Sequence, residues 1–165
     1  MPDFELRYLL LGALAIALLY AAFTDLKRRQ IDNWLNGAIA LAAPLYWWAA
    51  GFTLVDIGWQ LGLTLAAFAG FAVLFAMRAM GGGDVKLLAA LALWIKPAAY
   101  LKLLIIMALL GGLLTMLFGA WHVMRRQRHK LAIPYGVAIA SAGIWTIAAQ
   151  FSHVVTLTNL GTGLG

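Results

Sequence analysis

Cysteine is absent from this 165-residue sequence, and charged residues make up only 11% of it. The lack of cysteine excludes disulfides, thiol nucleophiles and cysteine-ligated zinc. Soluble domains carry about 25% charged residues, so the scarcity of charge excludes an ordinary soluble fold. Hydrophobic residues make up 64% of the chain. We therefore expect nearly all of it to lie in a membrane, with the lipid bilayer as its main surrounding.

Six apolar segments are candidate transmembrane helices, which need about 20 mostly apolar residues. We predict an all-α integral membrane protein with about six helices, at Tyr8–Phe23, Leu35–Phe52, Trp59–Met77, Val85–Ala99, Leu101–Trp121 and Leu131–Phe151. Val85 to Ile95 alone would cover only about 17 Å, so the fourth span is expected to continue past Lys96-Pro97. Residues 1–165 are interpreted as a single polytopic membrane domain.

The basic residues favour one orientation of these spans. Nine of the twelve fall in the first, third and fifth loops, which share a side: Lys27, Arg28, Arg29, Arg78, Lys86, Arg125, Arg126, Arg128 and Lys130. By the positive-inside rule that side is cytoplasmic, and both termini are expected on the other side. These residues are interpreted as topology signals and not as a nucleic-acid site. A cleavable signal peptide is disfavoured by Asp3 and Glu5.

Five of the six acidic residues divide into two groups. Asp3, Glu5 and Asp56 lie in the N-terminal tail or in a short outer loop, where a solvated surface role is expected. Asp25 ends the first apolar run and Asp84 begins the fourth. One helix arrives at the cytoplasmic face and the other departs from it, so the topology brings both aspartates to the same depth. They can therefore face each other.

Two carboxylates in one site can hydrolyse a peptide without a metal or cofactor. Mutual repulsion leaves one ionised and one protonated. The ionised group takes a proton from attacking water, and the protonated group polarises the carbonyl. A simpler alternative stays open, in which Asp25 neutralises Lys27 to Arg29 and Asp84 caps a helix. The glycines at 81–83 permit close approach of another chain, but such a triplet is more often only a hairpin.

Other polar and aromatic residues have ordinary explanations. Lys86 either supports the carboxylate of Asp84 or snorkels to the interface. Arg28 and Arg29 would repel a basic peptide, so we expect them to anchor their loop to anionic headgroups. An interfacial aromatic belt is expected from Trp47, Trp48, Trp59, Trp94, Trp121 and Tyr100. No ligand cluster or cofactor is expected from the histidines, which are His122, His129 and His153.

Three segments resemble a known family. MGGGDVKLLAALALW, residues 80–94, resembles the GxGD signature of the type IV prepilin peptidases, aspartyl membrane proteases that process pilin precursors. TDLKRRQIDNWLN, residues 24–36, is similar to that family's first-aspartate segment, although Asp32 stands where proline is usual. IPYGVAIASAG, residues 133–143, is similar to its Pro-Tyr-Gly segment. The resemblance implies that Asp25 and Asp84 are the catalytic pair. Gly81, Gly83 and Lys86 are expected to support them.

The resemblance also implies a substrate and a location. A peptidase of this kind cuts the basic leader from the hydrophobic segment of prepilins and pseudopilins, at the cytoplasmic face of the inner membrane. This short chain without cysteine resembles the peptidases of tight-adherence (Flp) pilus systems. We expect residues 1–165 to form a single membrane peptidase domain without a methyltransferase or zinc domain, and so to have peptidase activity without N-methylation. Three alternatives stay open: a preflagellin-type peptidase, a small transporter that uses the same acids, and a non-enzymatic assembly subunit. A homo-oligomer is also left open.

Overall fold

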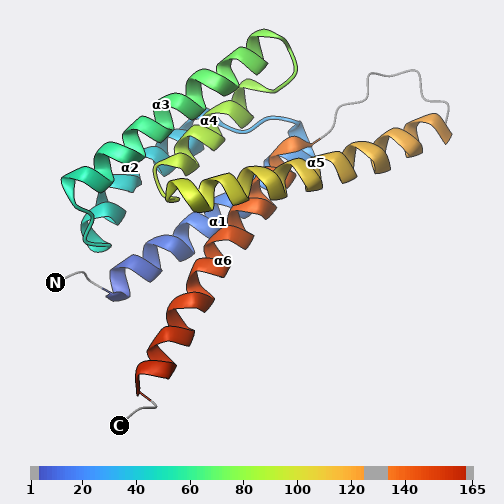
Figure 1. Cartoon of the computed structure of the whole chain (residues 1–165). Coiled ribbons are helices and arrows are strands. Elements are labelled where there is room, and N and C mark those ends of the chain that lie inside the picture. The colour runs from blue at the N-terminus through green and yellow to red at the C-terminus, as the bar shows by residue number, and fades with distance from the viewer. Residues whose placement is uncertain (1–3, 125–133, 163–165) are drawn as a thin grey trace.

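Six helices make up the part of the chain that this computed structural model describes, residues 4–124 and 134–162. They are α1 (Phe4–Arg28), α2 (Asn33–Ala49), α3 (Leu54–Ala76), α4 (Gly82–Ala92), α5 (Pro97–Met124) and α6 (Tyr135–Thr162). No strand occurs within these two ranges. Figure 1 shows the helices gathered into one bundle, with the C-terminal part of α5 projecting from it. The predicted all-α fold is confirmed.

Three of the helices are long and apolar enough to cross a membrane. These stretches are Glu5–Arg28 in α1, Leu54–Ala76 in α3 and Pro97–Trp121 in α5. A shorter apolar stretch, Tyr135–Ala149, belongs to α6. Such lengths match the hydrocarbon thickness of a bilayer, and the chain is a multi-pass membrane protein. The expected number of six passes stays a prediction.

The fourth apolar segment ends earlier than its sequence suggests. Helix α4 has 11 residues, which cover about 17 Å, too short to cross a bilayer unaided. At its C-terminal end the hydrogen bonding changes to the tighter i to i−3 pattern, in which the N–H of Leu93 donates to the carbonyl of Ala90 at 3.2 Å. Pro97 then opens α5, because proline suits a first helical position and disfavours helix in the residue before it. The expected continuation past Lys96-Pro97 is therefore wrong.

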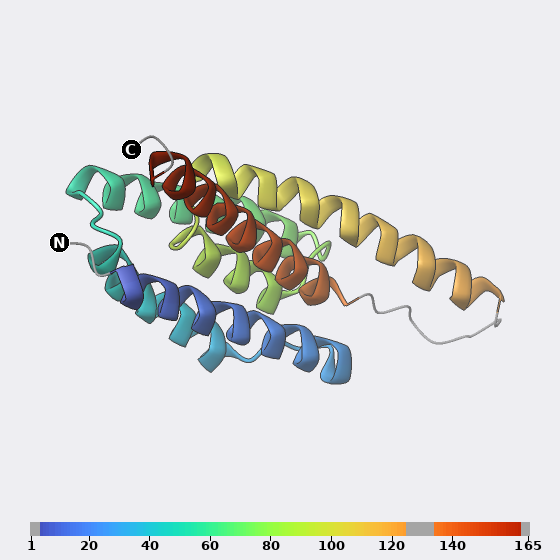
Figure 2. The same ribbon diagram turned by 90° about the horizontal axis from the view of Figure 1, so that it is seen from below.

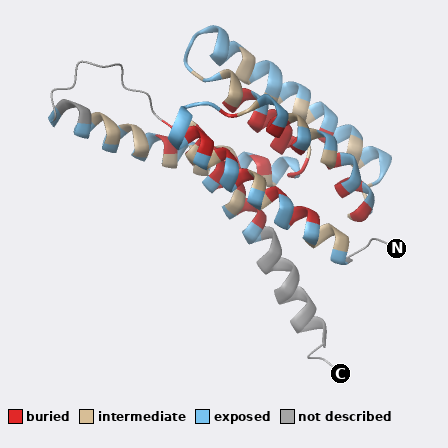
Figure 3. Ribbon diagram, turned by 180° about the vertical axis from the view of Figure 1, so that it is seen from behind, coloured by how far each residue is buried: buried red, intermediate tan, exposed pale blue. Residues whose placement is uncertain are grey.

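Helix α4 lies at the centre of the bundle. It packs against α2, α3 and α6, and Leu87, Leu88 and Leu91 are fully buried. In α3 the only buried residue is Gln60. Figure 3 shows this difference as red colouring concentrated on the central helices and pale blue along the outer ones. The short helix is thus a core element, and the longer α3 presents most of its surface outward.

Two tryptophans hold α4 against α2. The indole N–H of Trp47 donates to the carbonyl of Leu93 at 2.7 Å, and that of Trp94 donates to the carbonyl of Ile39 at 2.9 Å. Both rings are buried, as is Tyr100. The expected interfacial belt is wrong for these three residues, whereas Trp48, Trp59 and Trp121 are exposed as expected. The buried aromatic groups fix the C-terminal end of α4.

Four helix ends meet at one end of the bundle. Helices α1 and α3 end there, and α4 and α6 begin there, as the residues around the shared cleft show. Figure 2 shows α1 and α6 running along each other toward that end, in agreement with their extensive packing. The predicted basic cluster at 125–130 lies outside the described residues, as do the side chains of His122 and His153. This end carries the candidate site.

Candidate active site

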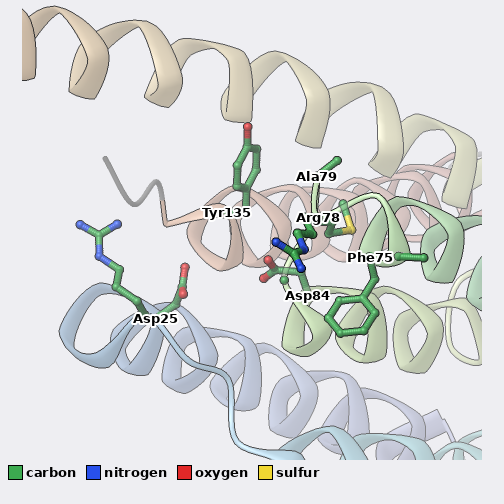
Figure 4. Close-up of a pocket in the computed structure, with 10 residues that line it drawn as sticks. Asp25, Phe75, Arg78, Ala79, Asp84 and Tyr135 are labelled. Carbon is green, nitrogen blue, oxygen red and sulfur yellow. The ribbon is translucent and has the colours of Figure 1, made fainter. Parts of the chain in front are cut away.

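A cleft of about 690 Å³ opens where the four helix ends meet. The last turn of α1 contributes Asp25, and the first turn of α4 contributes Asp84. The end of α3 and the loop after it, together with Tyr135, complete the lining. Figure 4 shows the two carboxylates directed into the same space from helices on opposite sides. The residues predicted to pair are therefore brought into one cavity.

Asp25 is buried and held by the start of α6. Its side chain is 6% exposed, and its Oδ2 accepts the backbone N–H of Gly136 at 2.9 Å. That N–H belongs to the first turn of a helix, where free donors and the helix dipole favour a negative charge. A Cβ at position 136 would lie 2.9 Å from Cγ of Asp25. Only glycine therefore lets α6 approach the carboxylate this closely.

Asp84 is buried in the first turn of α4, after the N-cap residue Gly81. Burial, and to a smaller extent the nearby charge of Asp25, raises the pKa of this carboxyl from 3.8 to about 6. A backbone hydrogen bond from Gly81 lowers the pKa and only partly offsets these effects. A Cβ at position 81 would lie 2.9 Å from Oδ2 of Asp84. The helix-start position matches the simpler capping alternative, but the carboxyl also lines the cleft.

The two carboxyls have different surroundings. Asp25 receives a helix N-terminal N–H, which stabilises an ionised carboxylate and works against the effect of burial. Asp84 has the raised pKa that stabilises a protonated carboxyl. Both aspartates also line a second cavity of about 430 Å³ beside the loop 30–33. Paired carboxyls whose environments separate their titrations are the arrangement that acid–base hydrolysis requires.

Comparison with known proteins agrees with this geometry. The type IV leader peptidase family matches residues 12–118, a segment that includes both aspartates. The chain belongs to this family. Two proteins of Aeromonas salmonicida, one from strain A449, bear the name prepilin leader peptidase/N-methyltransferase. Each is 32% identical over 163 residues, covering 92% of this chain and 54% of the relative.

The chain therefore spans about half the length of the curated relatives it matches. No solved structure matches it. The match to the leader peptidase family ends at residue 118, so the contact between Gly136 and Asp25 lies beyond the matched segment. The Pro-Tyr-Gly resemblance pointed to this segment of the sequence but assigned it no role. The structure shows its role, which is to hold the carboxylate of Asp25.

Two arginines of this leader peptidase family member border the cleft in a conformation that glycine usually adopts. Arg29 follows α1 with φ 55°, and Arg78 follows α3 with φ 58°. Left-handed residues commonly end helices, but a residue with a Cβ is disfavoured there. Both line the cleft, and the guanidinium of Arg29 lies 5.7 Å from the ring centre of Phe118. The expected anchoring of Arg29 to headgroups stays a prediction.

The predicted supporting residues have packing roles in the structure. A Cβ at Gly83 would lie 3.1 Å from Cβ of Ile31, and the carbonyl of Gly83 accepts the side-chain N–H of Asn36 at 3.2 Å. Lys86 donates to Oδ1 of Asn33 at 2.8 Å, and it does not line the cleft. Both residues tie α4 to the segment after α1. Functional roles for Gly81, Gly83 and Lys86 stay predictions.

Asp32, which replaces the usual proline, keeps a proline-like backbone. Its φ of −67° and ψ of 137° lie where proline is fixed. Its Oδ2 accepts an N–H of Arg28 at 2.7 Å. The departure from the family pattern therefore leaves the loop in a conformation that proline would also adopt, and it adds an ion pair to the last residue of α1.

Tyr135 lines the cleft but its hydroxyl is directed elsewhere. The hydroxyl lies 3.4 Å from Oγ1 of Thr115, and Figure 4 shows it pointing away from the two aspartates toward α5. A Cβ at Gly111 would lie 3.2 Å from the tyrosine ring, so glycine lets the ring pack onto α5. Tyr135 belongs to the Pro-Tyr-Gly segment that the resemblance pointed to without a role. Phe75 was not identified from the sequence, because it carries no signal apart from its apolar surroundings.

Proposed function

We propose that this protein is a membrane aspartyl endopeptidase that removes the leader peptide from type IV prepilins and pseudopilins. Family membership supports the reaction class, and the names of the relatives support the substrate class. The observation that carries the proposal is the cleft shared by Asp25 and Asp84. Within this class, the resemblance of the short chain favours Flp-type prepilins.

In this proposal Asp25 is the general base and Asp84 the general acid. Asp25 takes a proton from water as the oxygen attacks the scissile carbonyl, and Asp84 gives its proton to the carbonyl oxygen. The tetrahedral intermediate then collapses, and the C–N bond breaks. Asp25 gives its proton to the leaving amine, and Asp84 regains one from the hydroxyl. Both carboxyls return to their starting states, and no metal or covalent intermediate is needed.

The proposed site opens to the cytoplasm. Arg29 and Arg78 line the cleft, and Lys27 and Arg28 lie in the last turn of α1 beside it. Lys96, at the far end of α4, directs its ammonium over the ring of Phe52. An excess of basic residues at the cleft end supports a cytoplasmic orientation. Both termini would then lie on the non-cytoplasmic side of the inner membrane.

Cleavage of a synthetic prepilin with a basic leader ending in glycine tests the proposal. Purified protein in detergent or lipid is incubated with this substrate, and products are identified by mass spectrometry. Asp25→Asn and Asp84→Asn are each expected to lower kcat/KM by about 10³-fold, since each removes one proton-transfer group. The matched control is Asp56→Asn, because Asp56 lies in the capping box of α3 with Thr53.

The pattern among the variants decides the outcome. Loss of cleavage in the two cleft variants, with Asp56→Asn close to wild type, supports the proposed pair. Normal processing by a pure and folded Asp84→Asn sample rules out the assignment. Absence of cleavage by the wild type across several pilin types contradicts the peptidase proposal and favours a transporter or an assembly role for the same acids.

A further inference from the structure

A second, apolar groove lies between α3 and α5. It has a volume of about 420 Å³ and is lined by six residues of α3 and four of α5. The only lining side chain with a polar atom is Tyr100, whose hydroxyl donates to the carbonyl of Leu88 at 2.9 Å inside the bundle. The groove therefore offers no hydrogen-bonding group to an occupant. It suits an apolar surface.

The walls of this groove are membrane-spanning helices with little contact to each other. Both α3 and α5 are long and apolar enough to cross a bilayer. Helix α3 packs mainly on α4, and α5 packs mainly on α6, so the two barely touch. In hydrocarbon a peptide must satisfy its own backbone hydrogen bonds, and a single segment does so only as a helix. A peptide occupant of this groove is therefore an apolar helix.

The groove leads to the aspartate cleft along a single helix. Phe71 and Leu74 of α3 line the groove, and the next residues, Phe75 and Ala76, line the cleft. Figure 4 shows the Phe75 ring beside the cleft on the same helix that carries the groove. Residues on successive turns of one helix are about 5 Å apart. A helix seated in the groove would end next to the carboxylates.

We propose that the α3–α5 groove binds the apolar helical segment of the precursor, immediately beside its scissile bond. This inference rests on the proposed peptidase function and adds where the substrate is held. Gly70 lines the groove, and no atom lies within 4 Å of the position of a Cβ there. Small residues let transmembrane helices approach closely. The groove then sets the register of the substrate, because the helix end determines which peptide bond meets Asp25 and Asp84.

Two substitutions that fill the groove test this docking site. Gly70→Leu and Ala66→Leu each place a larger side chain in it, since both residues line the groove. The matched control is Ala69→Leu, because Ala69 is an exposed residue of α3 and does not line the groove. We expect Gly70→Leu and Ala66→Leu to raise KM for the intact precursor about tenfold with kcat within about twofold. Ala69→Leu should match wild type.

Photo-crosslinking separates docking from turnover. The precursor carries a photoreactive phenylalanine analogue in its apolar segment and is mixed with the Asp84→Asn protein. Crosslinks to the facing surfaces of α3 and α5, lost when Gly70→Leu is added, support the groove. Crosslinks to other helices, or equal KM values for all three leucine variants, overturn the proposed docking site. The groove would then be a surface that lipid chains cover. If the wild type cleaves no precursor, the proposed peptidase function is wrong, and the assignment of the precursor as the occupant of the groove is then wrong as well.

Discussion

Helices α3 and α4 are consecutive, antiparallel and both strongly apolar, yet the protein uses them in opposite ways. Eight of the eleven residues of α4 are buried. In α3, which has 23 residues, only Gln60 is buried. Hydropathy therefore does not separate a helix that faces lipid from one that forms the core. The length of a helix and its neighbouring helices determine whether it is buried. The buried helix here, α4, is the one that carries Asp84.

The outward-facing helix also helps to hold the buried one. Gln60 donates its side-chain N–H to the carbonyl of Leu93 at 3.2 Å, the same carbonyl that accepts from Trp47. At the other end, Asn36 donates to the carbonyl of Gly83. Helix α4 is thus fixed at both ends by side chains of α2 and α3. A carboxyl in its first turn has a defined position, as acid–base chemistry requires.

Truncating one leucine on each helix should give the largest difference in stability. Leu88 of α4 is 0% exposed and Leu65 of α3 is 71% exposed. Leu88→Ala leaves a cavity and is expected to lower the free energy of unfolding by about 2–4 kcal/mol. Leu65→Ala, whose side chain contacts lipid or detergent, should lower it by less than about 0.5 kcal/mol. Thermal unfolding in detergent measures both, and equal losses would contradict the assignment of α4 as the core helix.

The raised pKa of Asp84 predicts that its carboxyl destabilises the fold at high pH. The folded state binds this proton more tightly than the unfolded state, because its pKa moves from 3.8 to about 6. Stability is therefore full below about pH 4 and falls as the pH rises through 6. The side chain in Asp84→Asn stays neutral at every pH. The free energy of unfolding of this variant at pH 8 should therefore exceed that of the wild type by at most about 3 kcal/mol.

Thermal unfolding at pH 4, 6 and 8 measures this difference. The gain from Asp84→Asn should vanish at pH 4. Asp56→Asn should show no gain at any pH, because the backbone N–H and hydroxyl of Thr53 donate to the Asp56 carboxylate at the start of α3. A gain that is the same at all three pH values would mean that the carboxyl charge is not its cause. Wild-type kcat/KM should fall on the alkaline side, because the protonated acid is lost there.

The sequence predicted the helical class and the aspartate pair but not the packing of α4. Hydrophobic segments and the placement of basic residues put Asp25 and Asp84 at one face, since both signals depend on local composition. The end of α4 depends on Pro97. We predicted that the helix continues past this proline, because a membrane span needs about 20 residues. The left-handed conformations of Arg29 and Arg78 and the N–H of Gly136 at Asp25 arise from tertiary contacts. No periodicity in the chain encodes them.

Replacing a glycine by alanine should have different effects on α3 and α4. These effects are the smallest of those predicted here. A Cβ at Gly83 of α4 would lie 3.1 Å from Cβ and 3.3 Å from the carbonyl oxygen of Ile31, whereas one at Gly62 of α3 meets no atom within 4 Å. Gly83→Ala must shift the segment that follows Asp25, so kcat/KM should fall about tenfold, or about 1.4 kcal/mol. Gly62→Ala should keep full activity and gain up to about 1 kcal/mol in stability from helix propensity. Equal activities would show that the contact between Ile31 and Gly83 does not position the catalytic pair, and the site would then depend on the α6 contact alone.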